Sequence, residues 1–373
     1  MFDGQLGVNL LMLLGDSVPL PAPYEMVRAL TRAEVTSDAQ NGDGFQITFA
    51  LSKEQPIEYS LLQGGALDPP ARVILAALVG VVPQVLIDGI ITHHQHAPSD
   101  EPGESMLTVT GKDVSVMLDL EEKNEKYDNQ PDFLIVTRLL ASYAKYGLVP
   151  QVTPTTDVPI MLDRIPRQHE TDLQFIQRMA TRNGFVFYVE PLTIGVNRAY
   201  WGPPSRAGLP QPALTLGPGP AANLKSMHFT NDALAPVGTT GTFVEPITKS
   251  ALPIPPLPSL RIPPLVLKPA SPLRKQVTRD TANRNPASAA TAVLASSMSA
   301  ADPVSGSGEV DTVRYGNILR ARQLVGIRGV GLSYDGNYYV RRVTHTIESG
   351  DYKQSFEVSR EGTGALLPVV IPS

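Results

Sequence analysis

Residues 167–189 read RQHETDLQFIQRMATRNGFVFYV, and this stretch decides the fold. Thr171 can cap the start of a helix with its hydroxyl, and Gln174, three residues later, can reach back to the cap amide. Asp172 adds a negative charge at the positive end of the helix dipole. Gly184 supplies the left-handed stop at the other end. We therefore predict a helix that begins near Thr171 and ends at Gly184.

The predicted helix has one broad apolar side. Its apolar residues recur at the spacing of a helical turn, and its polar residues occupy the opposite side. After Gly184 the sequence changes to aromatic and β-branched residues from Phe185 to Val189, typical of a strand that Pro191 would end. The stretch thus predicts helix, glycine and strand in succession. The apolar set is Leu173, Phe175, Ile176, Met179 and Ala180.

Parts of this stretch resemble a known protein family. The pattern is similar to the signature of the phage late control protein D family, which VgrG proteins and myophage baseplate hubs share. Two further regions resemble that family in the same order, namely residues 111–148 and residues 334–347, which read YDGNYYVRRVTHTI. The signature residues are Gln168, Glu170, Asp172, Phe175, Arg178 and the run Gly184–Tyr188. The matches within 111–148 are Gly111, Asp113, Leu118, Asn129-Gln130, Ile135-Val136 and Tyr146–Leu148.

Composition limits the class of protein. The chain has 373 residues, 42% hydrophobic and 18% charged, which suits a folded protein of two or three domains. Its 35 prolines and 30 glycines favour β-rich structure with frequent turns over long helical bundles. A formal charge of -5 gives no basic footprint, so we expect no nucleic-acid binding. The chain has no cysteine, which excludes disulfides and thiolate chemistry and is consistent with assembly in a reducing cytoplasm.

The N-terminal part predicts strands. Alternating apolar residues at 33–35 and 45–51 flank the turn sequence Asn41–Gly44, which indicates a hairpin. Further apolar runs at 73–82, 85–91 and 106–110 predict three more strands, and a small closed or rolled sheet would bury them. Leu6–Leu14 is apolar but short and lacks a basic flank, so it predicts neither a signal peptide nor a membrane span.

The middle and C-terminal parts add helix and then strand. The charged run Glu121–Lys126 is interpreted as a solvated helix end, and residues 133–144 predict an amphipathic helix that Gly147 stops. Strand character returns over 215–229. Near the C-terminus, residues 324–330 and 338–347 flank an Asp335-Gly336 turn and predict a hairpin, with residues 352–360 as a further partner strand.

Residues 250–308 differ in kind. They combine many prolines with an Ala/Ser-rich tract that has little pattern. We interpret them as an extended or mobile insertion outside the barrels, where proteases should cut first. Compact relatives in the family need no such segment.

The resemblance implies a β-rich α+β fold. It implies a first tube-like β-barrel domain at 1–110, an α/β middle domain at 111–205, and a second barrel at 206–373 that carries the insertion at about 250–308. Family hubs are trimers in which two barrels per subunit give a pseudo-sixfold ring. The implied function is a structural hub of a contractile phage tail or injection-system baseplate, between the hexameric inner tube and a trimeric spike carried by a separate chain. Tube, spike and wedge proteins are the implied partners.

Candidate chemistry is weak in the sequence. His93, His94 and His96 form the main histidine cluster, but no carboxylate or cysteine at a familiar spacing accompanies them, so a role at a strand end is favoured over a metal site. His169, His228 and His345 are isolated and indicate structural hydrogen bonding. We assign no catalytic, cofactor-binding or metal-binding residue and no cofactor, and we expect that the protein is not an enzyme.

Two other classes of function stay open at the level of sequence. Carboxylates are numerous, so a cell-wall glycan hydrolase of the baseplate is one alternative. A β-rich adhesin or carbohydrate-binding protein is the other. The sequence contains no G-x-S-x-G elbow, no H-E-x-x-H and no P-loop, which favours the structural role.

Overall fold

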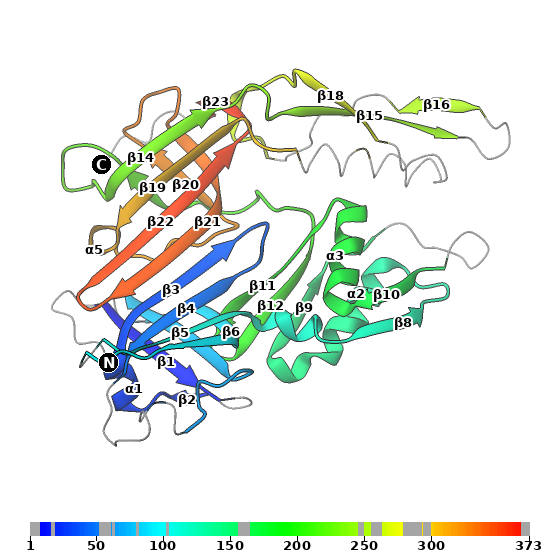
Figure 1. Cartoon of the computed structure of the whole chain (residues 1–373). Coiled ribbons are helices and arrows are strands. Elements are labelled where there is room, and N and C mark those ends of the chain that lie inside the picture. Colours follow the sequence, from blue (N-terminus) through cyan, green and yellow to red (C-terminus); the bar gives the residue numbers. More distant parts are fainter. Residues whose placement is uncertain are drawn as a thin grey trace.

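A computed structural model gives the fold (Figure 1) and describes residues 8–15, 19–51, 61, 64–79, 82–101, 104–155, 165–244, 250–254, 263–278, 293 and 300–366. The fold is β-rich, as predicted, and is dominated by one large and mostly antiparallel sheet. Two helices of more than ten residues, α2 (Asp132–Ser142) and α3 (Asp172–Asn183), lie to one side of it.

The central sheet has 13 strands. Along its main path the order is β14-β19-β22-β21-β3-β4-β7-β6-β5-β1-β2, and β20 and β13 branch from β21. The N-terminal strands are β1 (Val8–Leu14), β2 (Leu20–Pro21), β3 (Leu30–Asp38), β4 (Gly44–Ala50), β5 (Arg72–Val79), β6 (Pro83–Ala97) and β7 (Met106–Asp113). The C-terminal strands are β13 (Gln211–Thr215), β14 (Leu224–Asn231), β19 (Val304–Asp311), β20 (Leu324–Arg328), β21 (Gly336–Glu348) and β22 (Asp351–Arg360).

Both predicted hairpins are confirmed. In β3 and β4, Val35 pairs with Phe45 and Ala33 with Ile47 around the 41–44 turn. In β20 and β21, Leu324 pairs with Tyr339, and β22 pairs with β21 on its other side. The short helices α1 (Tyr24–Ala29) and α5 (Thr312–Tyr315) lie at the margins of this sheet.

The two groups of strands are joined by pairing between β3 and β21. These strands run antiparallel from Arg342 opposite Asp38 to Glu348 opposite Arg32. Neither β4 nor β21, which contain residues 45–50 and 338–347, is an edge strand of the sheet that the structure describes. Both strands are interior, because β4 lies between β3 and β7 and β21 lies between β22 and β3.

The middle segment packs its helices against two small sheets. One sheet pairs β8 (Glu122–Lys126) with β10 (Arg167–Thr171), and the other contains β9 (Leu148–Val152), β11 (Val186–Thr193) and β12 (Val196–Gly202). The interpretation of residues 121–126 as a helix end is therefore wrong. Strand pairing with β10 overrides the local charge pattern, and Pro191 lies inside β11 at a register shift instead of ending it.

The predicted helix at 172–183 is confirmed with both of its ends. The Thr171 hydroxyl accepts a hydrogen bond from the Gln174 backbone N–H at 3.3 Å. Gly184 has φ of 68°, the left-handed conformation that favours glycine. The second helix, α2, is followed by the 3-10 turn Ala144–Tyr146, and Gly147 ends it at φ of 76°.

The insertion is partly structured. Strand β15 (Val237–Val244) pairs with β16 (Ala251–Ile254) and β18 (Arg274–Thr278), while β17 (Val266–Pro269) pairs with β23 (Gly362–Ala365). Val304–Gly308, at the end of the expected insertion, belong to β19 inside the central sheet. Residues 255–262, 279–292 and 294–299 lie outside the described part of the chain.

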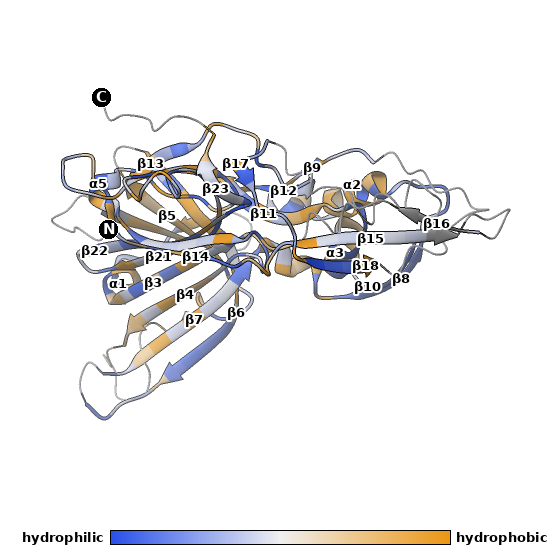
Figure 2. Ribbon diagram, turned by 90° about the horizontal axis from the view of Figure 1, so that it is seen from above, coloured by the Kyte–Doolittle hydropathy of each residue, from blue (hydrophilic) through white to orange (hydrophobic). Residues whose placement is uncertain are grey.

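Among the described residues, the three largest hydrophobic cores lie in three different parts of the molecule. One core fills the N-terminal strands, a second lies between the middle helices and their sheets, and a third fills the C-terminal strands. Ile347 and Tyr352 from the C-terminal strands also belong to the first core, so the two halves share buried surface. Figure 2 shows hydrophobic residues on strands of both halves. No helix in the described part of the chain is long and apolar enough to cross a membrane.

Candidate functional site

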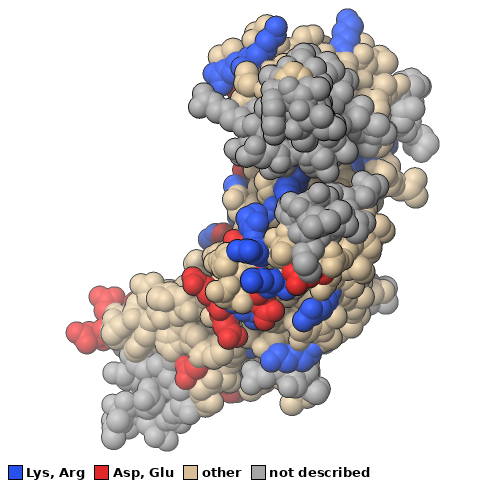
Figure 3. Space-filling model, turned by 90° about the vertical axis from the view of Figure 1, so that its right-hand side faces the viewer, with Lys and Arg blue, Asp and Glu red and all other residues tan. Residues whose placement is uncertain are grey.

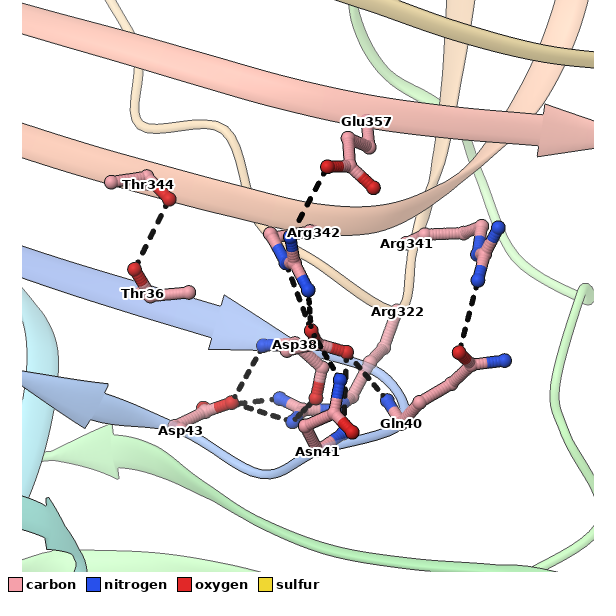
Figure 4. A network of polar contacts seen from close by, with 10 residues as sticks. All are labelled: Thr36, Asp38, Gln40, Asn41, Asp43, Arg322, Arg341, Arg342, Thr344 and Glu357. Carbon is pink, nitrogen blue, oxygen red and sulfur yellow. Dashed lines mark hydrogen bonds and ion pairs between the residues drawn. The ribbon is translucent and has the colours of Figure 1, made fainter.

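Three parts of the molecule meet at one buried arginine, Arg322, in the loop before β20 (Figure 4). Its guanidinium donates hydrogen bonds from Nη1 and Nη2 to the two carboxylate oxygens of Asp43, at 3.1 and 2.6 Å. Nη2 also donates to the backbone carbonyl of Asp38 at 2.6 Å. The same guanidinium lies 4.5 Å from the ring centre of Tyr188 in β11. Arg322 therefore links the C-terminal strands to the N-terminal hairpin and to the middle segment.

The Arg322–Asp43 pair is shielded from water. The two side chains are 4% and 3% exposed, so each needs the other as a partner. Burial alone lowers the pKa of Arg322, but the charge and hydrogen bonds of Asp43 more than offset it and raise the pKa above its usual value. The backbone of Arg322 has φ of 65°, which is uncommon for a residue with a side chain. Such strain persists where the surrounding contacts fix it, as they do at this junction.

A second carboxylate, Asp113 at the end of β7, supports the same junction. Its oxygens accept backbone N–H groups from Ser115 at 2.8 Å and from Asp43 at 3.1 Å. Burial, with the negative charge of Asp43 nearby, raises the pKa of the Asp113 carboxyl to about 6. A carboxyl with a raised pKa is the usual candidate for a general acid. Here the side chain is buried and both oxygens hold backbone, so its role is structural.

The outer part of the junction is open to solvent. Arg342 of β21 donates from Nε and Nη2 to one Asp38 oxygen at 2.9 and 2.7 Å, and from Nη1 to Glu357 at 3.2 Å. Thr36 and Thr344 are hydrogen-bonded across the β3–β21 seam at 3.1 Å. Two surface grooves of about 490 and 470 Å³ meet at Arg342 and Thr344. Arg342 is 41% exposed, so this pair is weaker than the buried one.

A further buried pair fixes the N-terminal strands to the middle segment. Arg72 of β5 donates from Nε and Nη2 to Asp88 of β6 at 2.8 and 2.7 Å, in a two-point contact. Nη2 also donates to the carbonyl of Tyr146 at 3.1 Å, and Asn197 of β12 donates to Asp88 at 2.8 Å. The middle segment is therefore held at two separate buried charges.

No family model and no curated protein matches the sequence. The tail protein from Neisseria meningitidis aligns with a TM-score of 0.63 at 14% identity, over 95% of this chain and 97% of that chain. The 43 kDa tail protein of prophage MuSo2 from Shewanella oneidensis aligns with a TM-score of 0.61 at 13% identity, over 95% and 98%. This chain has the fold of these phage tail proteins.

A chain of the Francisella PdpA–VgrG complex also aligns with this chain, with a TM-score of 0.57 at 9% identity. That alignment covers 99% of this chain and 55% of the other.

Two of the residues that carry the sequence resemblance, Gln168 and Asp172, lie together in the structure. One carboxylate oxygen accepts from Lys123 at 2.6 Å and from Tyr143 at 2.7 Å, and the other accepts from Gln168 at 2.7 Å. The Gln168 oxygen accepts the Tyr127 hydroxyl at 2.7 Å. The side chain of Asp172 therefore ties β8, α2 and β10 to the start of α3.

A second group of signature residues holds the outer face of α3. Arg178 donates from Nε to Glu170 at 2.7 Å and from Nη2 to the carbonyl of Arg167 at 2.9 Å. Its guanidinium also lies 5.0 Å from the ring centre of Phe175. These contacts show what the signature residues do in the structure: they fix helix α3 to strand β10.

The predicted histidine cluster lies on β6. His94 and His96 are partly buried, His93 is exposed, and His94 Nδ1 lies 3.5 Å from a carboxylate oxygen of Asp68. In the part of the chain that the structure describes, no three His, Cys, Asp or Glu side chains form a group that could hold a metal ion.

The isolated His345 does have the expected structural role. Its Nδ1 lies 2.9 Å from the Tyr352 hydroxyl, and burial, with the charge of Arg320, lowers the pKa of the imidazole to about 3. The imidazole is therefore neutral at physiological pH and serves as a buried hydrogen-bonding group.

Sequence reasoning missed the junction itself. Asp43 had been interpreted only as part of a turn, and Arg322 had not been singled out. The turn sequence around Gly42 does carry a weak signal, since Gly42 has φ of 78° and lies against Asp113. Nothing in the sequence near Arg322 indicates its partner, which lies 279 residues away.

Proposed function

We propose that this protein is a structural baseplate hub of a contractile phage tail or of a phage-tail-like injection system, where it joins the hexameric inner tube to a trimeric central spike. The observation that carries the proposal is the β3–β21 pairing. It places two groups of antiparallel strands side by side in one continuous sheet. A single subunit therefore offers two successive arcs of β-sheet.

The two arcs of sheet in one subunit support a role in matching a sixfold tube to a threefold spike. A hexameric tube needs six similar surfaces, and three subunits with two arcs each would supply them. Because cyclic assemblies repeat the same contact around a ring, the two arcs of one subunit must keep a fixed relation. The buried pairs at Arg322 and Arg72 meet this need, since they hold the N-terminal strands to the C-terminal strands and to the middle segment.

The proposal includes the domain division predicted from the sequence. Residues 1–110 and 206–373 would form the two tube-like barrels, and residues 111–205 would form the middle domain. The spike would be a separate chain, with tube and wedge proteins as the other partners. The particle would assemble in the cytoplasm of the producing cell.

Electron microscopy of the hub co-expressed with its spike and tube proteins tests this proposal. The expected particle has threefold symmetry at the hub, with two density lobes per subunit in one ring. A sixfold ring of this chain, or a monomer that persists with all partners present, would refute it. The Arg342→Leu variant keeps the buried Arg322–Asp43 pair, and it should assemble like the wild type.

The proposal also includes the absence of catalysis. The described carboxyl with a raised pKa, Asp113, is enclosed and holds backbone N–H groups, which supports a structural role. A peptidoglycan gel assay should show no cleared band for the purified protein. Clearing that disappears when one carboxylate is changed to its amide would contradict the proposed absence of catalysis.

A further inference from the structure

The two grooves that meet at Arg342 and Thr344 belong to one continuous polar surface of the central sheet. This surface, called the polar face below, runs across β14, β19, β22, β21, β3 and β4, which Figure 1 shows side by side. Residues opposite each other on neighbouring strands point to the same side of a sheet, so strand pairing fixes the composition of the face. One row of such neighbours is Ser226, Glu309, Ser355, Thr344 and Thr36, and the next is Lys353, Thr346, Glu34 and Gln46.

The polar face offers little that would hold a protein partner. Among the described residues, none of these six strands carries a large exposed hydrophobic side chain. Binding energy at protein interfaces is concentrated in a few buried anchors, most often aromatic residues and arginine. The side chains here are largely hydroxyls and amides, and Thr36 and Thr344 are hydrogen-bonded to each other at 3.1 Å. The face is therefore better suited to contact with water than to contact with another protein surface.

Charges on the polar face cancel one another in pairs. Four of its cations have carboxylate partners at 2.7–3.2 Å, namely Arg32 with Glu34 and Glu348, Arg342 with Asp38 and Glu357, Lys353 with Asp351, and Lys225 with Glu309. Exposed pairs of this kind add little stability. Opposite charges so close together produce little net field beyond about 8 Å, the screening length at physiological salt. A charged chain that passes the face therefore meets little net attraction or repulsion.

The molecule is hollowed on the side of the polar face. Figure 3 views the molecule from the right-hand side of Figure 1, so the face that Figure 1 shows lies along the left-hand outline. That outline is concave between the upper end of the molecule and the projection at lower left. A concave side encloses a space when copies of a subunit repeat around an axis.

We infer that the polar face is a non-adhesive wall, hydrated and charge-neutral, past which a hydrophilic chain moves without being held. The inference rests on the proposed hub function and deepens it, since it assigns this face to the space inside the ring. The concave sides of three copies would surround the axis, and the copies would meet one another and their partners through other surfaces.

Cysteine labelling tests the position of the wall, because the chain has no cysteine of its own. Ser355 is exposed on the polar face, and Ser355→Cys is nearly isosteric. In the separate subunit, this cysteine should react with a small maleimide dye and with a maleimide attached to a folded protein. In the assembled ring it should keep its reaction with the dye and lose its reaction with the protein-linked reagent. Ser142→Cys, exposed at the end of α2, is the matched control and should react with both reagents in both states.

Charged reagents of similar size measure the local potential in the separate subunit. A cationic and an anionic methanethiosulfonate should modify Ser355→Cys with a rate ratio within about threefold of that for a cysteine in a short unstructured peptide, because paired charges leave little net potential. Adding Glu357→Gln removes one carboxylate from the face and should shift this ratio about twofold toward the anionic reagent at low salt, and less at high salt. Glu122→Gln changes the net charge equally on β8 and should leave the ratio unchanged.

The outcomes separate this inference from the hub proposal. If Ser355→Cys in a threefold ring still reacts with the protein-linked reagent, the face lies outside the ring, and if it reacts with neither reagent, another protein covers the face. Either result overturns the inference and leaves the hub proposal standing. A rate ratio that differs from the peptide value by much more than threefold overturns the neutral wall, whatever the ring shows. The absence of any threefold particle refutes the hub, and the position of the wall with it.

Discussion

The molecule contains two networks of buried charge, one around Asp172 in the middle segment and one around Asp43 at the sheet junction. The first stabilises a single segment, and the second stabilises the arrangement of several segments. The partners of Asp172 lie between 4 and 49 residues away along the chain, so they complete one local unit. The Asp43 network joins residues 279 apart and touches three parts of the molecule. One network makes a part, and the other fixes how the parts are arranged.

The difference shows where rigidity has to come from in this fold. A segment with its own core can be stable alone, but an arrangement of segments needs contacts that depend on all of them at once. A paired buried charge suits this purpose, because either member left without its partner is strongly unfavourable.

The largest effect is expected for Arg322→Leu. It leaves Asp43 buried without its counter-charge, beside Asp113, and we expect a loss of about 3–5 kcal/mol in the free energy of unfolding. At φ of 65° the backbone strain is similar for leucine and for arginine, so it cancels when the variant is compared with the wild type. Urea denaturation followed by tryptophan fluorescence gives the measurement.

Arg342→Leu is the matched control at the same seam. It removes an arginine that also contacts Asp38 but is 41% exposed, and its expected cost is at most about 1 kcal/mol. Equal losses for the two variants would contradict the distinction between the buried and the open part of the junction.

Asp172→Ala should cost about 3 kcal/mol, since it removes the acceptor of three hydrogen bonds and leaves Gln168 buried with a lost partner. Lys123 is 30% exposed and can turn to water, which limits the loss. Hydrogen exchange should show faster opening confined to α3 and β10. Faster exchange that extends to β3 and β21 would mean that this network is not local.

The pH dependence of stability should report on Asp113. Its pKa is about 6 in the folded protein and near 3.8 in the unfolded chain, so the folded state binds more protons between these values. Stability from this group therefore falls as the pH rises from about 4 through 6, by roughly 2 kcal/mol. Asp113→Asn should flatten this part of the profile, and a variant that keeps the same slope would contradict the assignment of the slope to Asp113.

Gly184→Val should cost roughly 1 kcal/mol or more, because a β-branched residue fits the left-handed helix end poorly. Gly184→Asn should cost less, since asparagine tolerates that conformation. Thermal melting compares the two. Identical melting temperatures for both variants and the wild type would show that the helix end is not fixed by this residue.

Local elements could be predicted from the sequence where the residues that determine them are neighbours in the chain. The cap at Thr171, the stop at Gly184 and the turns at 41–44 and 335–336 all depend on residues within a few positions. The failure at 122–126 has the opposite cause. Five largely charged residues look like solvent-exposed helix, yet strand β10, more than forty residues later, supplies their hydrogen bonds.

The junction could not be predicted, because each of its members is ordinary in its own neighbourhood. Asp43 reads as a turn residue and Arg322 as a loop residue, and only the pairing of β3 with β21 brings them together. The resemblance of separated regions to one family did predict that the parts belong to one fold. It carried no information about which side chains join them.

The β3–β21 pairing also sets a condition on how the chain is made. Asp38 and Arg342 are 304 residues apart, so during synthesis β3 emerges long before the strand that covers its second edge. Contacts between such distant segments form slowly, and an uncovered strand edge invites pairing with other chains. If synthesis stops in the middle segment, the incomplete chain exposes the edge of β3 that β21 would cover, and this edge can pair with other chains. The yield of folded protein therefore depends on keeping that edge unpaired until β21 has been synthesised.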